Sequence, residues 1–181
     1  YYAHRVPRDS SQLKKPETLA EHIELVQDKF LLLSHLSGLN AVIDKLVIDI
    51  GEDNFIKTNK EDASNFIKKL FVNTIVYHDY GKVNENFQAH PEKMNNPFFQ
   101  MNEESPILTY HSGLSAYLYI AKHFQELYEN KVFHSSEQLA ISYIILSFSY
   151  SIFRHHSPYL NDEIDKKVIF TKEVMEHMKE Y

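Results

Sequence analysis

The stretch that decides the fold of this chain is residues 62–82, DASNFIKKLFVNTIVYHDYGK. Residues able to face inward recur in it at steps of three and four, the spacing of one face of an α-helix: Phe66, Ile67, Leu70, Phe71, Thr74, Ile75 and His78. Asp62 or Ser64 can cap the start of this helix, and Gly81 can end it in the left-handed conformation. The pattern predicts a helix over residues 62–80 that carries His78-Asp79 at its end.

The same periodicity continues along the chain and predicts an all-α fold. The sequence has only four glycines and six prolines, whereas an all-β domain of this length needs more turn residues. Its 43 % hydrophobic content is enough to bury one core, so we expect a single compact domain. Further helices are expected at residues 17–36, 39–50, 111–128, 136–153 and 162 to about 179, with a short helix around residues 84–89.

Composition excludes several kinds of site and partner. The chain has no cysteine and 11 histidines, so any metal would be held by histidine and carboxylate. Its net charge is −6, whereas a protein that binds DNA stably usually has a basic surface. A nucleic-acid substrate would therefore be delivered by another domain or a partner. No signal peptide or long apolar run is present, so we expect a cytoplasmic protein with no membrane partner.

Two histidines are predicted to face inward from two different helices. His78 lies on the apolar face of the helix over residues 62–80 and precedes Asp79. His22 lies in the stripe formed by Leu19, Ile23, Val26, Phe30 and Leu33. Each buried imidazole needs a partner. Hydrogen bonds in the core are one solution for His22; a metal ion shared with His78 and Asp79 would satisfy both histidines.

Three more histidines and a lysine are candidates because of their places at helix ends. His111 opens one predicted helix, where it could equally be a surface residue. His155-His156 ends another, where paired histidines can bind one ion or simply favour the helix dipole when protonated. Lys82 follows Asp79 by three residues and could neutralise a phosphate. The remaining histidines lie in polar or terminal settings and are assigned no role: His4, His35, His90, His123, His134 and His177.

The order of these candidates resembles the HD-superfamily nuclease domain of Cas3, the nuclease-helicase of type I CRISPR systems. The resemblance covers about residues 2–158 and rests on short sequence motifs as well as on the order of the candidates. The matching segments are Tyr2-Ala3-His4, Leu19-Ala20-Glu21-His22, His78-Asp79-Tyr80-Gly81-Lys82 followed by Asn86-Phe87-Gln88, His111-Ser112-Gly113-Leu114-Ser115-Ala116, and His155-His156. It implies a compact helical domain with a metal site between its helices.

This chain departs from the family pattern in three places. Tyr80 stands where an aliphatic residue is commoner, and Ser157 stands where glycine usually follows the paired histidines. The family also supplies a late aspartate to its first metal, and Asp162 and Asp165 are too close to the pair to be that residue. We therefore expect residues 1–181 to be a single HD nuclease domain, truncated before that aspartate and cut from a larger nuclease-helicase.

The residues and the resemblance together imply a two-metal phosphodiesterase. One divalent ion would be held by His22, His78 and Asp79, and the second by His111, His155 and His156, with Asp79 bridging the two. The ions would generate a hydroxide and hold the scissile phosphate, while Lys82 would stabilise charge developing on it. Nitrogen-rich ligation favours transition metals (manganese, iron, cobalt or nickel) over magnesium.

The resemblance further implies single-stranded DNA as substrate, degraded after a Cascade complex has opened the target. A helicase domain, fused or separate, would feed the strand to the nuclease. Two alternatives remain open. The chain could be another HD phosphohydrolase that acts on nucleotides or cyclic dinucleotides. It could also be a catalytically incomplete docking module whose histidines bind metal only weakly.

Overall fold

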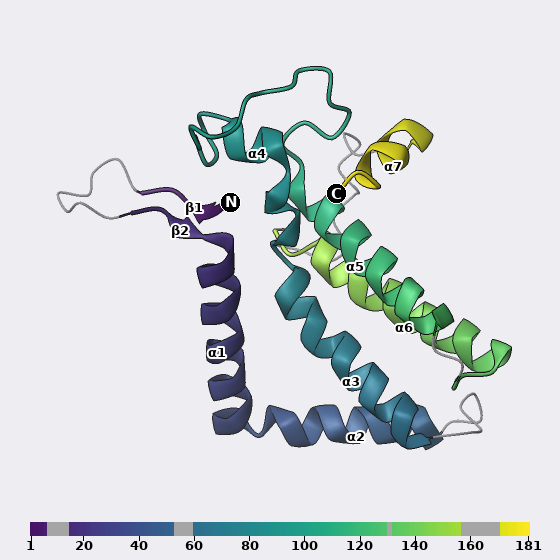
Figure 1. Ribbon diagram of the computed structural model, residues 1–181. Coiled ribbons are helices and arrows are strands. Elements are labelled where there is room, and N and C mark those ends of the chain that lie inside the picture. Colours follow the sequence, from purple (N-terminus) through teal and green to yellow (C-terminus); the bar gives the residue numbers. More distant parts are fainter. Residues whose placement is uncertain (7–14, 53–59, 130–131, 157–170) are drawn as a thin grey trace.

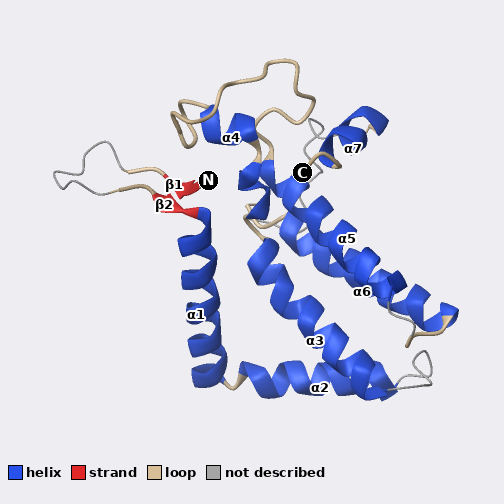
Figure 2. Ribbon diagram, viewed as in Figure 1, coloured by secondary structure: helices blue, strands red, loops and turns tan. Residues whose placement is uncertain are grey.

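The structure, a computed structural model, describes residues 1–6, 15–52, 60–129, 132–156 and 171–181 (Figure 1). Helices dominate the described residues, which confirms the all-α prediction (Figure 2). The helices are α1 (Leu19–Ser37), α2 (Leu39–Glu52), α3 (Lys60–Tyr77), the 3-10 helix η1 (Tyr80–Val83), α4 (Glu85–Ala89), α5 (His111–Glu129), α6 (Ser135–Phe153) and α7 (Lys172–Met178).

Helix α3 is the predicted helix over residues 62–80, but it ends at Tyr77 and the chain then tightens into η1. The prediction that Gly81 takes the left-handed conformation is wrong, since among the described glycines only Gly38 has positive φ. Gly81 is needed for a different reason. Its backbone touches the start of α5, where an added Cβ would overlap the His111 carbonyl oxygen and lie 2.6 Å from the Ser115 nitrogen.

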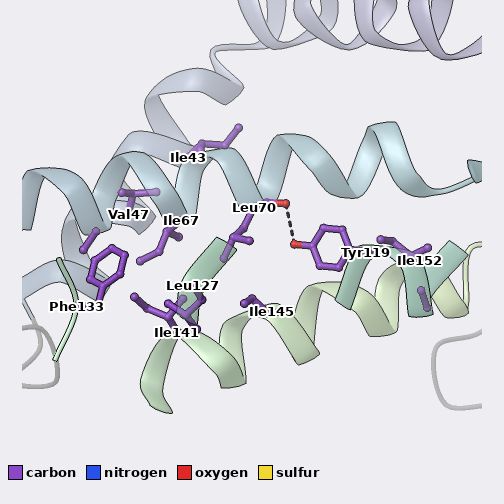
Figure 3. Packing of buried hydrophobic residues seen from close by; sticks show 12 residues of the cluster. Ile43, Val47, Ile67, Leu70, Tyr119, Leu127, Phe133, Ile141, Ile145 and Ile152 are labelled. Atoms are coloured by element: carbon purple, nitrogen blue, oxygen red, sulfur yellow. Dashed lines mark hydrogen bonds between the residues drawn. The ribbon is translucent and has the colours of Figure 1, made fainter. Parts of the chain in front are cut away.

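The core is formed where α3, α5 and α6 pack together, with α2 covering one end (Figure 3). Burying each large side chain there, rather than leaving it exposed, stabilises the folded state by about 1.5–3 kcal/mol. The Tyr119 hydroxyl donates to the Leu70 carbonyl at 2.9 Å and ties α5 to α3. Because α5 runs opposite to α3 and α6, the start of α5 meets the ends of the other two helices (Figure 1). The fully buried members of this core are Ala63, Leu70, Tyr119, Leu127, Ile141 and Ile145.

The N-terminal end corrects two predictions. Residues 17–18 do not begin a helix but form β2 (Glu17–Thr18), which pairs antiparallel with β1 (Tyr2–His4). Thr18 is extended and caps α1 through a reciprocal capping box with Glu21, so the helix starts at Leu19. The predicted buried stripe of α1 is also only partly correct, because Leu33 is 60 % exposed.

Helix α1 packs against the core along part of its length only. It ends at Ser37, and Gly38, whose φ is 70°, turns the chain into α2. The two helices meet at 87°, and no single described helix is long and apolar enough to cross a membrane.

The C-terminal helix is shorter than predicted in its described part. Helix α7 spans Lys172–Met178, while the first part of the expected helix, residues 162–170, lies outside the described residues. Thr171 caps α7 by accepting a hydrogen bond from the Val174 nitrogen at 3.2 Å. Val174 and Met178 then bury themselves against Ile107 and Leu114, which fixes α7 beside the start of α5.

Candidate metal centre

The Asp79 carboxylate lies at the point where α3, α5 and α6 converge, and its two oxygens face different histidines. Oδ2 is 3.2 Å from His22 Nε2 and 3.3 Å from His78 Nε2. Oδ1 is 3.4 Å from His111 Nε2 and 3.3 Å from His155 Nε2. The structure therefore brings four predicted histidines around one buried carboxylate, two on each oxygen.

His156 joins the cluster through His111. The two Nε2 atoms are 2.9 Å apart, so both rings cannot present a protonated nitrogen to each other. Burial, reinforced by the neighbouring charges of His155 and His111, lowers the pKa of His156 to about 4. His156 is therefore a neutral imidazole at physiological pH, the form that binds a metal ion.

Local helix geometry aims two of the rings. His78 Nδ1 donates to the Ile75 carbonyl and His155 Nδ1 donates to the Ile152 carbonyl, both at 2.6 Å. A carbonyl can only accept, so Nδ1 carries the proton in both rings and Nε2 is the atom turned toward Asp79. A backbone carbonyl that holds the second ring nitrogen is the usual support of a metal-ligating histidine.

Within the described part of the chain, three atoms of this cluster are buried without a hydrogen-bond partner: His22 Nε2, Asp79 Oδ1 and His155 Nε2. Such orphaned groups are costly unless something else satisfies them. Two ligand atoms about 2.1 Å from one ion are roughly 3.0 Å apart at a right angle and 3.4 Å at the tetrahedral angle. The separations of 3.2–3.4 Å around Asp79 match this range, so the residues fit a divalent cation.

The electrostatics of the cluster keep Asp79 ionised. Burial alone would raise the pKa of its carboxyl, but the groups facing it outweigh burial and lower the pKa. These groups are the imidazoles of His111, His155 and His78 and the ammonium of Lys82. Burial lowers the pKa of His22 and of His111. Burial acts the same way on His78, but there Asp79 and the Ile75 carbonyl outweigh burial and the pKa is raised.

Lys82 is buried beside the carboxylate rather than free on the surface. Its ammonium is 2.8 Å from Asp79 Oδ2 and donates to the Ala3 carbonyl at 3.1 Å. Lys82 therefore connects the N-terminal ribbon, formed by β1 and β2, to the cluster around Asp79. The ribbon is held from a second side by Gln88, whose side-chain amide accepts from Tyr2 nitrogen and donates to Tyr2 oxygen, each at 2.8 Å.

Sequence reasoning missed Glu17 and the setting of His4. Glu17 Oε2 lies 2.5 Å from His4 Nδ1 and 3.4 Å from His22 Nδ1, so it faces the ring nitrogen of His22 that points away from Asp79. His4, Glu17 and His22 together form a further group able to hold a cation. The signal available was the position of His4 in Tyr2-Ala3-His4; nothing in the sequence indicated that residue 17 would pair with it.

The assignment of His123 to a polar setting is wrong. It is fully buried on α5, where Asn73 Nδ2 donates to Nε2 at 3.2 Å and Nδ1 donates to Glu126 Oε2 at 3.1 Å. Its spacing of four residues from Tyr119 was a usable signal. Asp162 and Asp165, which sequence analysis set aside as the late aspartate, lie outside the described residues.

Comparison with protein families gives one finding. The sequence model of the family described as "Cas3, HD domain" matches residues 21–179. The matched span contains His22, Asp79 and every other residue of the cluster around Asp79. Comparison with curated proteins and comparison with solved structures each gave no match.

Proposed function

The chain belongs to the family of Cas3 HD domains, which are CRISPR-associated metal-dependent hydrolases, and from this premise we propose that it cleaves the phosphodiester bonds of single-stranded DNA in type I CRISPR interference. The observation that carries the proposal is the arrangement of Asp79. Each of its carboxylate oxygens faces its own pair of imidazole nitrogens. A carboxylate shared in this way suits a two-metal centre, in which the ions stabilise the attacking and leaving oxygens.

The proposed ligands fall into two sets. His22, His78 and Asp79 would hold one ion, and His111, His155 and His156 would hold the other, with Asp79 bridging. When bound, the ions would supply a water of lowered pKa and positive charge near the scissile phosphate. The protein keeps Asp79 ionised and keeps His156 neutral, which prepares both for metal binding. Lys82 adds a positive charge beside Asp79, where it would stabilise charge developing on a bound phosphate.

Ligand chemistry favours a transition metal. Five imidazoles and one carboxylate make a nitrogen-rich set, whereas magnesium prefers oxygen ligands and retained water. Manganese, iron, cobalt and nickel are therefore the proposed ions.

The strand would be delivered by other components. With a net charge of −6, the chain lacks the charge that would hold DNA over a long surface. We propose that a helicase domain, fused or separate, feeds the strand after a Cascade complex has opened the target. This reaction would take place in the cytoplasm.

The test is cleavage of single-stranded DNA by the protein supplied with manganese, cobalt or nickel, compared with Asp79→Ala. Loss of both metal content and cleavage in Asp79→Ala is expected. Asp62→Ala, which removes an exposed carboxylate at the start of α3, is the matched control and should cleave like the wild type. Equal cleavage by the Asp79 variant would overturn the proposal.

A substrate panel separates the alternatives. Faster turnover of nucleotides or cyclic dinucleotides than of single-stranded DNA would identify a different HD phosphohydrolase. A metal content below one equivalent, with no loss of stability on chelation, would instead identify a docking module.

A further inference from the structure

A cavity of about 700 Å³ opens beside the histidines of the second metal set. It lies between α4, the loop before α5, the end of α6 and α7, and its lining includes His111 and His156. The volume is within the range of sites that hold small organic ligands. Because the cavity adjoins the metal-binding residues, a group bound in it would be next to any phosphate held there.

The charges that line the cavity are positive or titratable, although the chain as a whole is acidic. Among the residues that the structure describes, Lys82, Lys93 and three histidines contribute to the lining, and no aspartate or glutamate does. The whole chain has 25 acidic and 19 basic residues. Lys93 is exposed, and the described part of the chain offers it no acidic partner within 4.0 Å. Lys82 is already paired with Asp79, so Lys93 is the charge that suits the cavity to an anion.

The ring of Phe87 sets the spacing of these charges. The ammonium groups of Lys82 and Lys93 each lie 6.0 Å from its centroid, and the His111 ring lies 4.6 Å from it. Phe87 is buried, so its position is fixed by the core of α4 and α5. Both ammonium groups therefore lie near the same buried ring, beside the proposed metal ligand His111, and the exposed one of the two is Lys93.

Leu108 lines the cavity with an apolar side chain, and its backbone adopts an unusual conformation. Its φ is 40°, in the left-handed region that leucine rarely adopts. The buried Asn84 side chain donates to the Leu108 carbonyl at 2.8 Å and holds the loop in this shape. The Leu108 side chain nevertheless remains 54 % exposed. A strained residue that is held in place yet gains no burial points to a functional contact.

We propose that this cavity binds one nucleotide unit of the single-stranded substrate, next to the bond that is cut. The nucleotide's phosphate lies toward Lys93, and its base lies against the exposed side chain of Leu108 and the small exposed parts of Ile107 and Val174. A nucleotide joins an anionic phosphate to a flat, largely apolar base, which matches the two kinds of surface in the cavity. The inference rests on the proposed function and adds to it the residues that bind the strand.

Binding of a fluorescein-labelled oligodeoxythymidine to the metal-free protein in EDTA tests the cavity apart from the reaction. Lys93→Glu should weaken binding about tenfold and reduce the slope of log K against log salt by about 0.7, the value for one lost phosphate contact on a single strand. Leu108→Asn should weaken binding about threefold without lowering the melting temperature, because asparagine tolerates positive φ.

Lys29→Glu is the matched control for charge. Lys29 is an exposed residue of α1 outside the cavity lining, and its replacement lowers the net charge as much as Lys93→Glu does. It should bind the oligonucleotide like the wild type. Equal weakening by Lys29→Glu and Lys93→Glu would show that only overall charge matters and would overturn the proposal. Wild-type binding by both cavity variants would overturn it as well.

Thymidine 5′-monophosphate separates a nucleotide of a strand from a free nucleotide. The oligonucleotide should bind more tightly than the monophosphate, and the cavity variants should weaken both. A monophosphate that binds as tightly as the oligonucleotide would overturn the assignment to a strand. If the wild type binds the oligonucleotide through Lys93 and Leu108 but does not cleave it with any metal, the proposed function fails while the cavity stands as a nucleotide site.

Discussion

Gly81 and His111 are in backbone contact: a Cβ at residue 81 would overlap the carbonyl oxygen of His111. The Gly81 nitrogen also donates to Ser115 Oγ at 2.7 Å, so η1 rests directly on the first turn of α5. This contact sets the distance between Asp79, which precedes η1, and His111, which opens α5. The absence of a side chain at residue 81 is thus a condition for the cluster around Asp79.

Gly81→Ala is expected to disturb the metal centre as well as the fold. The atoms that the new methyl group meets are backbone atoms of α5, which cannot move aside cheaply, so we expect a loss of about 1–3 kcal/mol in the free energy of unfolding. Displacement of η1 should also weaken manganese binding, measured by calorimetric titration.

Gly38→Ala is the comparison variant for this change. No atom of the described residues lies within 4 Å of a Cβ at residue 38, but its φ of 70° makes alanine strained there. We expect a loss of about 1–2 kcal/mol with unchanged manganese affinity. Equal effects of the two glycine variants on metal affinity would contradict the role assigned to the Gly81–His111 contact.

Glu17→Gln is expected to weaken metal binding through His22. The Glu17 carboxylate faces His22 Nδ1 at 3.4 Å and so favours the ring form with Nε2 free to bind an ion. Removing such a support typically costs 10–100-fold in affinity, and we expect about tenfold here. The check is competition for manganese with a chelator of known affinity. The control is Glu24→Gln, at an exposed position of α1, the helix that carries His22; it should show wild-type affinity.

Metal removal is expected to destabilise the protein. Manganese at about a hundred times its dissociation constant should raise the free energy of unfolding by about 2.7 kcal/mol relative to protein in EDTA. Asp79→Asn should show almost none of this gain, because it takes away the charged ligand common to both sets of histidines. Urea unfolding with and without manganese measures the difference. A gain of wild-type size in Asp79→Asn would contradict the proposed ligand sets.

The stability of the metal-free protein should fall in mild acid, in part through His123. Burial lowers the pKa of His123 below its usual 6.5, and Glu126 only partly opposes this. Because the folded-state pKa is the lower one, the unfolded state binds more protons between the two pKa values. The stability tied to neutral His123 is therefore complete above pH 6.5 and is lost as the pH falls through the folded-state pKa.

His123→Gln isolates this contribution, since glutamine does not titrate. Urea unfolding in EDTA at a series of pH values should show the wild type losing stability below pH 6.5 faster than the variant. Wild-type and variant curves that stay parallel across this range would show that His123 does not change its charge on unfolding.

Helix periodicity in the sequence was sufficient for the all-α fold and for α3, whose inward-facing positions were read correctly at Ile67 and Leu70. The candidate ligands were also selected from sequence, and the structure brings all of them together; their roles as metal ligands remain a prediction. Periodicity failed for Leu33, because it shows which face of α1 is apolar but not how far a neighbour extends along that face.

The sequence alone determined which chemistry this protein can carry: histidine and aspartate in a fixed order, no cysteine, and helices whose ends bear the polar residues. Only the tertiary structure decided the pairing of each Asp79 oxygen with its own histidines, the contact of Glu17 with His22, and the cavity beside His156. The physical reason is the separation along the chain over which each interaction acts. Helix formation depends on neighbours within a turn, whereas these relationships join residues far apart in the chain through the packing of α3, α5 and α6.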